Sequence, residues 1–166
     1  IIRDIFVSRS KKFKGHDPWR YGEELSEFTD KVEFDWIMKN FEISDNTTIV
    51  DVGCGTGRHV LLLAELTKAK VVGCDFVPEN IEFINKLIGQ MGLYNASGVF
   101  SDATEFSEHV GVDSCDLVIA IGVIQYLTNQ DQLNRFSNSC SEILLSGGSL
   151  ILKHPLSFTE SFLLDY

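Results

Sequence analysis

The apolar positions of the chain alternate between two spacings. Short apolar runs rich in β-branched residues predict buried strands, and apolar residues at three- and four-residue steps predict amphipathic helices. The runs predict strands over residues 47–52, 69–75, 98–101, 116–121 and 149–153. The steps predict helices over residues 22–40, 57–68, from Pro78 onward and 129–145. The inner face of the first helix is expected to carry Leu25, Phe28, Val32, Trp36 and Ile37.

Alternation of short buried strands with helices is typical of an open α/β fold. Its sheet is parallel and is covered by helices on both faces. Ligands bind such sheets at the carboxyl ends of the strands. The residues that directly follow each strand are therefore the first place to look for function. Within the 166 residues we expect a basic segment over residues 1–21 and one domain over residues 22–166.

Charge is unevenly distributed along the chain. Residues 1–20 carry a net +4, the remainder carries −14, and the whole chain carries −10. An acidic domain repels phosphate backbones, so the charge predicts that nucleic acid is not a partner. The basic stretch SRSKKFK, residues 8–14, has two interpretations, an arm over an anionic substrate or a solvated segment.

Targeting and redox features are few. No apolar run approaches the roughly 20 residues that cross a bilayer, so no membrane association is expected. No secretory pattern follows Ile1, and the four cysteines lack CxxC spacing. These features predict a fragment of a cytoplasmic chain with reduced thiols.

The first predicted strand leads into a glycine-rich turn, VDVGCGTGR, at residues 50–58. Glycine allows a tight turn and a close approach of the backbone to a ligand at the start of the next helix. The alternative is close packing of helix on strand. A dinucleotide-binding turn would need a third glycine where Arg58 stands, which disfavours an oxidoreductase.

Carboxylates mark the ends of three successive predicted strands. Asp51 ends the first, Asp75 the second, and Asp102 follows the third. An acid at the end of the second strand can accept hydrogen bonds from ribose hydroxyls. Buried carboxylates are costly unless they are paired or bind something, so these three predict a ligand at this edge of the sheet.

The five motifs together resemble those of the class I S-adenosylmethionine-dependent methyltransferases, over residues 17–154. The motifs are VDVGCGTGR, GCDFVPENI, SDATEF, DLVIAIGVIQYL and GGSLILK. The resemblance implies a Rossmann-like α/β fold with strand order 3-2-1-4-5, S-adenosylmethionine as cofactor and S-adenosylhomocysteine as product. That family has two more strands after the fifth, so we expect the last two strands to be absent and the domain to be incomplete at its C-terminus.

The resemblance also implies roles at the methionine end of the cofactor. Gly53, Cys54 and Gly55 would line the methionine part, and Asp51 would support its ammonium group. A sulfonium cofactor with an ammonium group suits a carboxylate-rich site.

At the nucleoside end, the same resemblance assigns Asp75 to the ribose and Phe76 to a place beside the adenine. Asp102 would accept a hydrogen bond from the adenine amino group, and the Ala103 amide would donate to the ring.

Two further regions complete the expected site. Ile121 and Gly122 would contact the methionine group and form the floor where the acceptor approaches. Upstream, DPWRYGEELSEF loosely resembles a segment of nodulation-type N-methyltransferases, which makes Trp19 and Tyr21 candidates for a lid over the cofactor. The alternative for these rings is an aromatic staple on the first helix.

Methyl transfer is an in-line displacement, so a general base is optional. A hydroxyl acceptor would benefit from one, whereas a neutral amine would not. His154 and Tyr126 are the candidate catalytic residues, with structural roles as the alternatives, and His16 and Asp17 are weaker candidates.

The residues that characterise three methyltransferase subclasses are missing after the fourth predicted strand. The sequence IGVIQYL replaces the Asn/Asp-Pro-Pro-aromatic motif of enzymes that methylate base amino groups. It also lacks the carboxylates of a metal-dependent catechol-type site and the acid of a ribose 2′-hydroxyl site. We therefore expect a metal-free methyltransferase with a small-molecule amine or hydroxyl acceptor. The alternatives are a non-catalytic cofactor-binding subunit and, less favoured, a dinucleotide oxidoreductase. The oligomeric state is not predicted.

Overall fold

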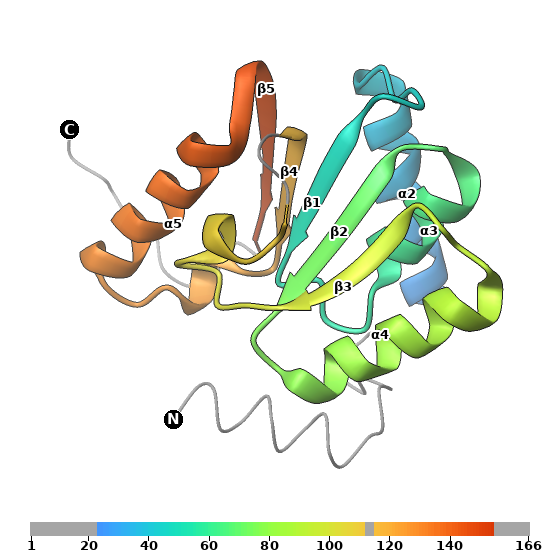
Figure 1. The fold of residues 1–166 in the computed structure, drawn as a ribbon, viewed down its shortest axis with the longest axis horizontal. Coiled ribbons are helices and arrows are strands. Elements are labelled where there is room, and N and C mark those ends of the chain that lie inside the picture. The colour runs from blue at the N-terminus through green and yellow to red at the C-terminus, as the bar shows by residue number, and fades with distance from the viewer. Residues whose placement is uncertain (1–22, 112–114, 155–166) are drawn as a thin grey trace.

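The computed structural model describes residues 23–111 and 115–154. Within these residues, five strands form one parallel sheet in the order β3-β2-β1-β4-β5 (Figure 1). The strands are β1 (Thr48–Val52), β2 (Lys70–Asp75), β3 (Ala96–Phe100), β4 (Cys115–Ile121) and β5 (Leu144–Lys153). The order reverses between β1 and β4, and open α/β sheets bind ligands beside such a reversal. The expected α/β class and strand order are confirmed.

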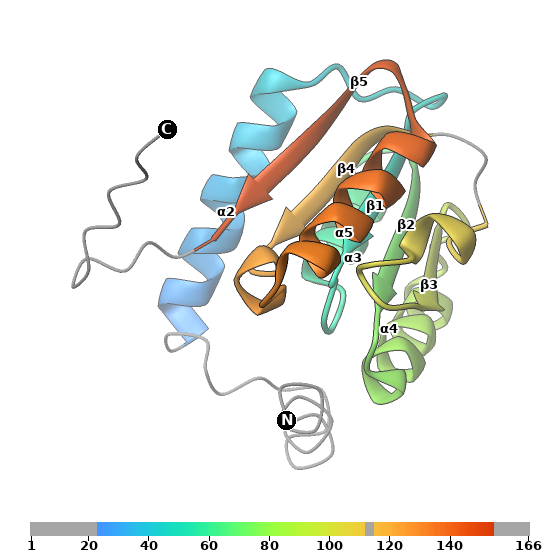
Figure 2. The ribbon, with the colours of Figure 1, turned by 90° about the vertical axis from the view of Figure 1, so that its left-hand side faces the viewer.

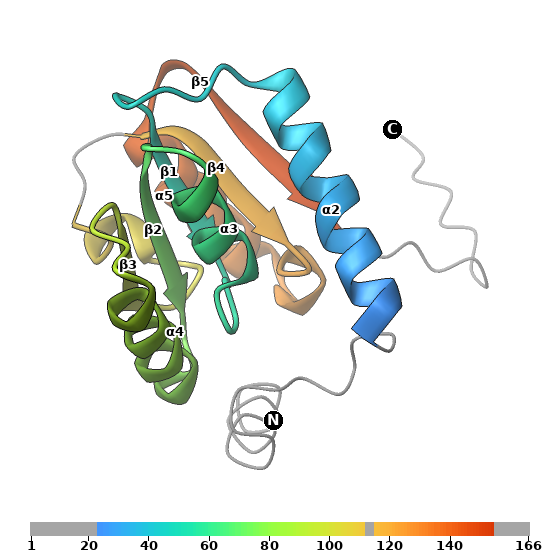
Figure 3. The same cartoon turned by 90° about the vertical axis from the view of Figure 1, so that its right-hand side faces the viewer.

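Helices cover both faces of the sheet, as Figures 2 and 3 show. One face carries α2 (Glu23–Asn40), α3 (Arg58–Leu66) and α4 (Pro78–Met91). The other face carries α5 (Gln130–Ile143) and the short 3-10 helix η1 (Phe106–Glu108). Successive strand residues point to opposite faces, so each face has its own apolar core. In the part of the chain described, no helix is both long and apolar enough to cross a membrane.

The inner face of α2 differs from the predicted one. Val32 is 49% exposed and Trp36 is 50% exposed, whereas Ile37 is buried and Glu33 is only 9% exposed. The helix is therefore rotated about its own axis relative to the prediction. Glu33 faces the sheet, and Val32 and Trp36, which were expected there, are half exposed. This rotation is possible because Glu33 meets cationic partners there, which are described below. Leu25 and Phe28 belong to α2, but the structure does not describe their side chains.

The last strand begins earlier than predicted. β5 starts at Leu144, which pairs with Cys115, whereas Leu117 pairs with Ser149. The residues between these pairs form an irregularity that contains Gly147 and Gly148, with Gly147 at a φ of 88°. The predicted strand over residues 149–153 is the regular part of β5.

The close packing around Gly73 gives a prediction about stability. Gly73 lies in β2, where an added Cβ atom would come within 2.6 Å of Val60 Cγ2 and 2.9 Å of Cys54 Sγ. Gly73→Ala is expected to lower the free energy of unfolding by about 1–3 kcal/mol, because overpacking a core costs that much. Denaturant unfolding measures the change.

Gly89→Ala is the matched control for Gly73→Ala. Gly89 lies inside α4, and an added Cβ atom there meets nothing within 4 Å. Alanine is the better helix former by about 1 kcal/mol, so this variant is expected to be as stable as the parent or slightly more stable. If both variants lost the same stability, the contact at Gly73 would not be the cause.

Candidate functional site

The glycine turn lies at the carboxyl edge of the sheet, between β1 and α3. Gly53, Gly55 and Gly57 all have positive φ values, of 67°, 56° and 85°. A Cβ atom on Gly53 would come within 2.5 Å of Val123 Cγ2, whereas one on Gly55 would meet nothing within 4 Å. The turn therefore packs against the protein at Gly53 and borders open space at Gly55, which is where a ligand can approach the backbone.

Asp75, at the end of β2, holds this turn in place. Its Oδ2 accepts a hydrogen bond from Gly55 N at 2.9 Å. Its Oδ1 accepts from Val77 N at 2.9 Å and from Asn80 Nδ2 at 3.2 Å. Burial raises the pKa of the Asp75 carboxyl, and the backbone hydrogen bonds oppose that rise. One carboxylate thus links the glycine turn to the start of α4, and Phe76 lies half-buried directly after it.

Asp51, in β1, is a buried carboxylate that lacks a hydrogen-bond partner on one oxygen. The residue is 2% exposed, and its Oδ2 atom has no partner among the described residues. His59 Nδ1 lies 3.9 Å from Oδ2, which is beyond hydrogen-bond range. Burial raises the pKa of Asp51 to about 6, against the opposing effects of His59 and Arg58. Such an oxygen is suited to a cationic ligand.

Glu33, on α2, lies beside Asp51 and has the opposite surroundings. Arg58 Nη2 lies 2.5 Å and His59 Nε2 lies 3.1 Å from Glu33 Oε2. Lys153 Nζ, at the end of β5, contacts Glu33 Oε1. Burial alone would raise the pKa of Glu33, but the hydrogen bonds from His59 and Lys153 and the charge of Arg58 lower it to about 2.

The sequence reasoning missed this cluster of Glu33, Arg58, His59 and Lys153. One feature of the sequence could have found it. Glu33 precedes the buried Ile37 by four residues, so the two side chains share one face of the helix, and a charge on that face needs partners.

Asp102 follows β3 and is exposed. Its Oδ1 accepts hydrogen bonds from Thr104 N and Thr104 Oγ1, both at 2.9 Å. One oxygen of the carboxylate therefore stabilises the local turn. Ala103 lies half-buried within that turn.

The residues after β4 and β5 lie at the same edge. Ile121 is half-buried, and Gly122 has a φ of 72° and donates from its amide to Lys153 O at 2.7 Å. Tyr126 ends the 3-10 helix η2 (Ile124–Tyr126) and is 39% exposed, and His154 is exposed directly after β5. The roles assigned to these four residues stay predictions. Trp19, Tyr21, His16 and Asp17 lie outside the described residues.

The expected cofactor fits this edge. It offers a glycine turn open at Gly55, an unpartnered buried oxygen on Asp51 for an ammonium group, and the Asp75 carboxylate for hydroxyl donors. When bound, S-adenosylmethionine supplies an electrophilic methyl group on its sulfonium sulfur. No group of three metal-ligating side chains occurs among the residues described, and none is needed for that chemistry.

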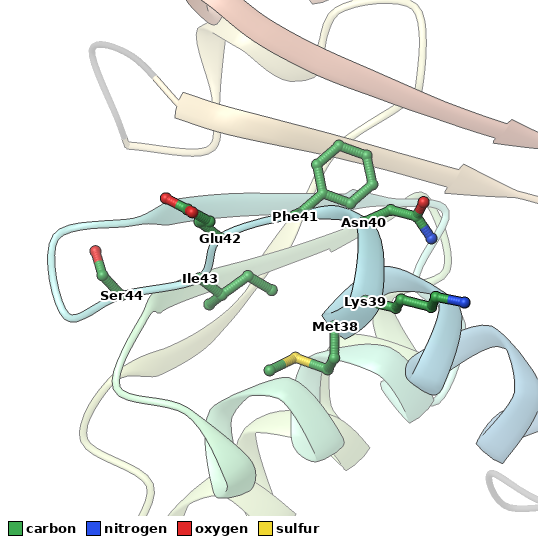
Figure 4. Close-up of a pocket in the computed structure, with 7 residues that line it drawn as sticks. All are labelled: Met38, Lys39, Asn40, Phe41, Glu42, Ile43 and Ser44. Carbon is green, nitrogen blue, oxygen red and sulfur yellow. The ribbon is translucent and has the colours of Figure 1, made fainter.

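A hollow elsewhere on the molecule is not part of this site. Its volume is about 570 Å³, and Figure 4 shows the residues that line it, Met38–Ser44. These residues form the end of α2 and the first part of the loop that leads to β1, so the hollow lies at the amino ends of the strands. The glycine turn lies at the opposite edge.

A comparison with known protein families identifies the family of this chain. A family model described as a methyltransferase domain matches residues 43–161 of this chain. The chain belongs to that methyltransferase family. The match contains the glycine turn and all three acids, so the expected class I S-adenosylmethionine-dependent methyltransferase family is confirmed.

Individual relatives of the methyltransferase domain differ in what they act on. The chain is 31% identical to the tRNA N(3)-methylcytidine methyltransferase trm141 of Schizosaccharomyces pombe, over 92% of this chain and 64% of that protein. It is 30% identical to a probable (S)-tetrahydroprotoberberine N-methyltransferase 2 of Papaver bracteatum, over 53% of this chain and 24% of that protein. The chain thus spans less than two thirds of the length of either relative.

A solved structure shares the fold. The Haemonchus contortus phosphoethanolamine N-methyltransferase 1, in complex with phosphoethanolamine and S-adenosylhomocysteine, superposes with a TM-score of 0.69 at 22% identity. The superposition covers 92% of this chain and 32% of that protein.

The expectation that nucleic acid is not a partner is wrong. Relatives of the methyltransferase domain include proteins named as tRNA and ribosomal RNA methyltransferases. A net charge summed over a domain does not describe the local field, and residues 1–20 carry +4. The missing Asn/Asp-Pro-Pro-aromatic motif does not exclude a base either, because N3 of cytidine is a ring nitrogen and not an amino group.

Proposed function

We propose that this protein transfers the methyl group of S-adenosylmethionine to a nitrogen of a nucleobase in RNA, with tRNA as the substrate class. The observation that carries the proposal is the likeness to the S. pombe tRNA N(3)-methylcytidine methyltransferase, which extends over 92% of the chain. That likeness reaches well beyond the family motifs at the strand ends.

The distribution of charge supports an RNA acceptor. Residues 1–20 carry +4, which favours a phosphate backbone, while the remaining residues carry −14. The acidic part attracts the cationic cofactor, and the basic part attracts the anionic acceptor. One chain can thereby bind two partners of opposite charge.

The chemistry of a ring nitrogen also suits this edge of the sheet. A nitrogen such as N3 of cytidine attacks with a lone pair and has no proton to lose, so the reaction needs no general base. Alignment and exclusion of water can then supply most of the acceleration, and orientation alone contributes up to about 7–11 kcal/mol. The methyl group carries positive charge to the acceptor, and the acidic charge of residues 21–166 favours a cationic product. In this proposal Tyr126 and His154 contact the acceptor base.

Methyl transfer to total tRNA tests the proposal. The protein is incubated with methyl-labelled S-adenosylmethionine and tRNA, and the digested nucleosides are analysed by mass spectrometry. The expected result is label in a ring-methylated nucleoside.

A parallel reaction with cyclic tertiary amines tests the alternative acceptor class, which the relatives named as tetrahydroprotoberberine N-methyltransferases suggest. Label in an amine with none in tRNA would overturn the RNA proposal. Binding of S-adenosylhomocysteine without transfer to any acceptor would instead favour a non-catalytic cofactor-binding subunit.

A further inference from the structure

Two buried carboxylates lie side by side at the cofactor edge but are neutralised very unequally. The Glu33 carboxylate contacts Arg58 and His59 at the start of α3 and Lys153 at the end of β5. Asp51 Oδ2 has no hydrogen-bond partner in the described part of the chain. Both carboxylates are at least nine-tenths buried. The local cations are therefore concentrated on one carboxylate of the two.

His59 connects the two carboxylates. Its Nε2 lies 3.1 Å from Glu33 Oε2, and its Nδ1 lies 3.9 Å from Asp51 Oδ2. The low pKa of Glu33 keeps that carboxylate ionised, and an ionised carboxylate only accepts, so Nε2 carries the proton and donates to it. The contact with Glu33 thereby holds the ring about 1 Å too far from Asp51 for a hydrogen bond.

Arg58 is the second group that Glu33 holds. The guanidinium directly follows the glycine turn and lies near enough to Asp51 to lower the pKa of that carboxyl. A guanidinium released from Glu33 would find Asp51 as an adjacent buried anion without a hydrogen bond on Oδ2. An ion pair between them would compete directly with a cationic ligand at Asp51.

We propose that Glu33 is a positioning residue that holds Arg58 and His59 away from Asp51, so that Asp51 stays available to the ammonium group of the cofactor. The inference rests on the proposed contact of Asp51 with that ammonium group. It assigns to α2, which precedes all five strands, a direct part in cofactor affinity.

Two ligands that differ only in the ammonium group test this proposal. Calorimetry compares S-adenosylhomocysteine with its desamino analogue, in which hydrogen replaces the α-amino group. In the unmodified protein the amine-bearing ligand is expected to bind at least tenfold more tightly. Glu33→Gln is expected to remove most of that difference, by weakening S-adenosylhomocysteine about tenfold and the desamino analogue less than twofold.

A second substitution separates positioning from a structural role. Glu33→Gln combined with Arg58→Gln is expected to bind S-adenosylhomocysteine within about threefold of the unmodified protein, because the released guanidinium is gone. Asp45→Asn is the control, since its carboxylate is exposed, lies 3.6 Å from the exposed Lys68 Nζ and precedes β1 at the opposite edge. Glu33→Asp, which keeps the charge, is the second test if Glu33→Gln does not fold, and it is expected to lose part of the same selectivity.

The outcomes separate this inference from the proposed cofactor site. Equal weakening of both ligands by the Glu33 substitutions, or a double variant that binds more weakly than Glu33→Gln, would overturn the positioning role. If the unmodified protein bound both ligands equally, the contact of Asp51 with the ammonium group would be refuted, and the inference with it.

Discussion

Replacing Asp75 by alanine is expected to weaken the binding of S-adenosylhomocysteine by about 100-fold or more. Asp75 accepts from Gly55 N and Val77 N, each at 2.9 Å, so its loss releases the glycine turn and the start of α4 together. It also removes the expected acceptor for the ribose hydroxyls. A hydrogen bond to a charged group contributes about 1.5–3 kcal/mol. The loss of the two expected hydrogen bonds from the ribose hydroxyls therefore corresponds to at least a 100-fold change in affinity. Titration calorimetry measures the loss.

Asp75→Asn separates the charge of this side chain from its shape. Asparagine keeps one carbonyl oxygen as an acceptor, so its affinity is expected to lie between those of the alanine variant and the parent. Asp45→Asn, at an exposed ion pair, should bind like the parent. Denaturant unfolding establishes that each variant is folded at the temperature of the titration. An unchanged affinity in Asp75→Ala would refute the assignment of Asp75 to the cofactor.

The strands could be predicted because parallel strands buried on both faces are mostly apolar, whereas their order came from the family resemblance. β1 and β4 show this directly, with most residues fully buried. Chain direction then places the ends of β1, β2 and β3 at one edge, so the three acids meet there without any knowledge of side-chain contacts. Only the family resemblance gave those acids separate roles.

The contacts of Glu33 could not be predicted in the same way. Its partner His59 is 26 residues distant in the chain, and Lys153 is 120 residues distant. An apolar pattern reports burial, whereas a buried charge is stable only when cations from other elements reach it. The stripe through Val32 and Trp36 was therefore assigned to the core, although Glu33 and Ile37 occupy that face.

Asp102 illustrates a different limit. A strand-end acid can bind a ligand, stabilise its own turn, or use one oxygen for each, and the apolar pattern does not distinguish these cases. Thr104 offers both an amide and a hydroxyl to Asp102 Oδ1, so one oxygen serves the turn. The expectation that nucleic acid is not a partner failed for a related reason, since it rested on the −14 charge of the domain and gave too little weight to the basic segment of +4.

Asp51 is expected to stabilise the folded protein less as the pH rises, so its contribution to the free energy of unfolding decreases. Burial raises the pKa of Asp51 from 3.8 to about 6. Between those values the native state holds a proton that the unfolded chain has released, so stability falls with rising pH, by about 3 kcal/mol in total. The contribution of Glu33 has the opposite sign but acts below pH 4.5, because its pKa is lowered from 4.5 to about 2.

Asp51→Asn isolates the contribution of Asp51. The variant has no proton to lose at position 51, so its stability relative to the parent should increase from pH 4.5 to pH 7. Urea unfolding of both proteins across that range gives the difference. A constant difference would show that Asp51 ionises with an ordinary pKa.

Cofactor affinity is expected to follow the same ionisation with the opposite sign. Only the ionised carboxylate attracts the ammonium group, so the affinity for S-adenosylhomocysteine should rise by up to about tenfold per pH unit below pH 6 and level off above it. The free energy gained when the ammonium group binds then offsets the loss of stability that ionisation of Asp51 causes in the free protein. In Asp51→Asn the affinity should be lower at pH 7 and nearly independent of pH between 4.5 and 7. Calorimetry of both proteins across this range decides the point, because an equally steep rise in the variant would assign the titration to a group other than Asp51.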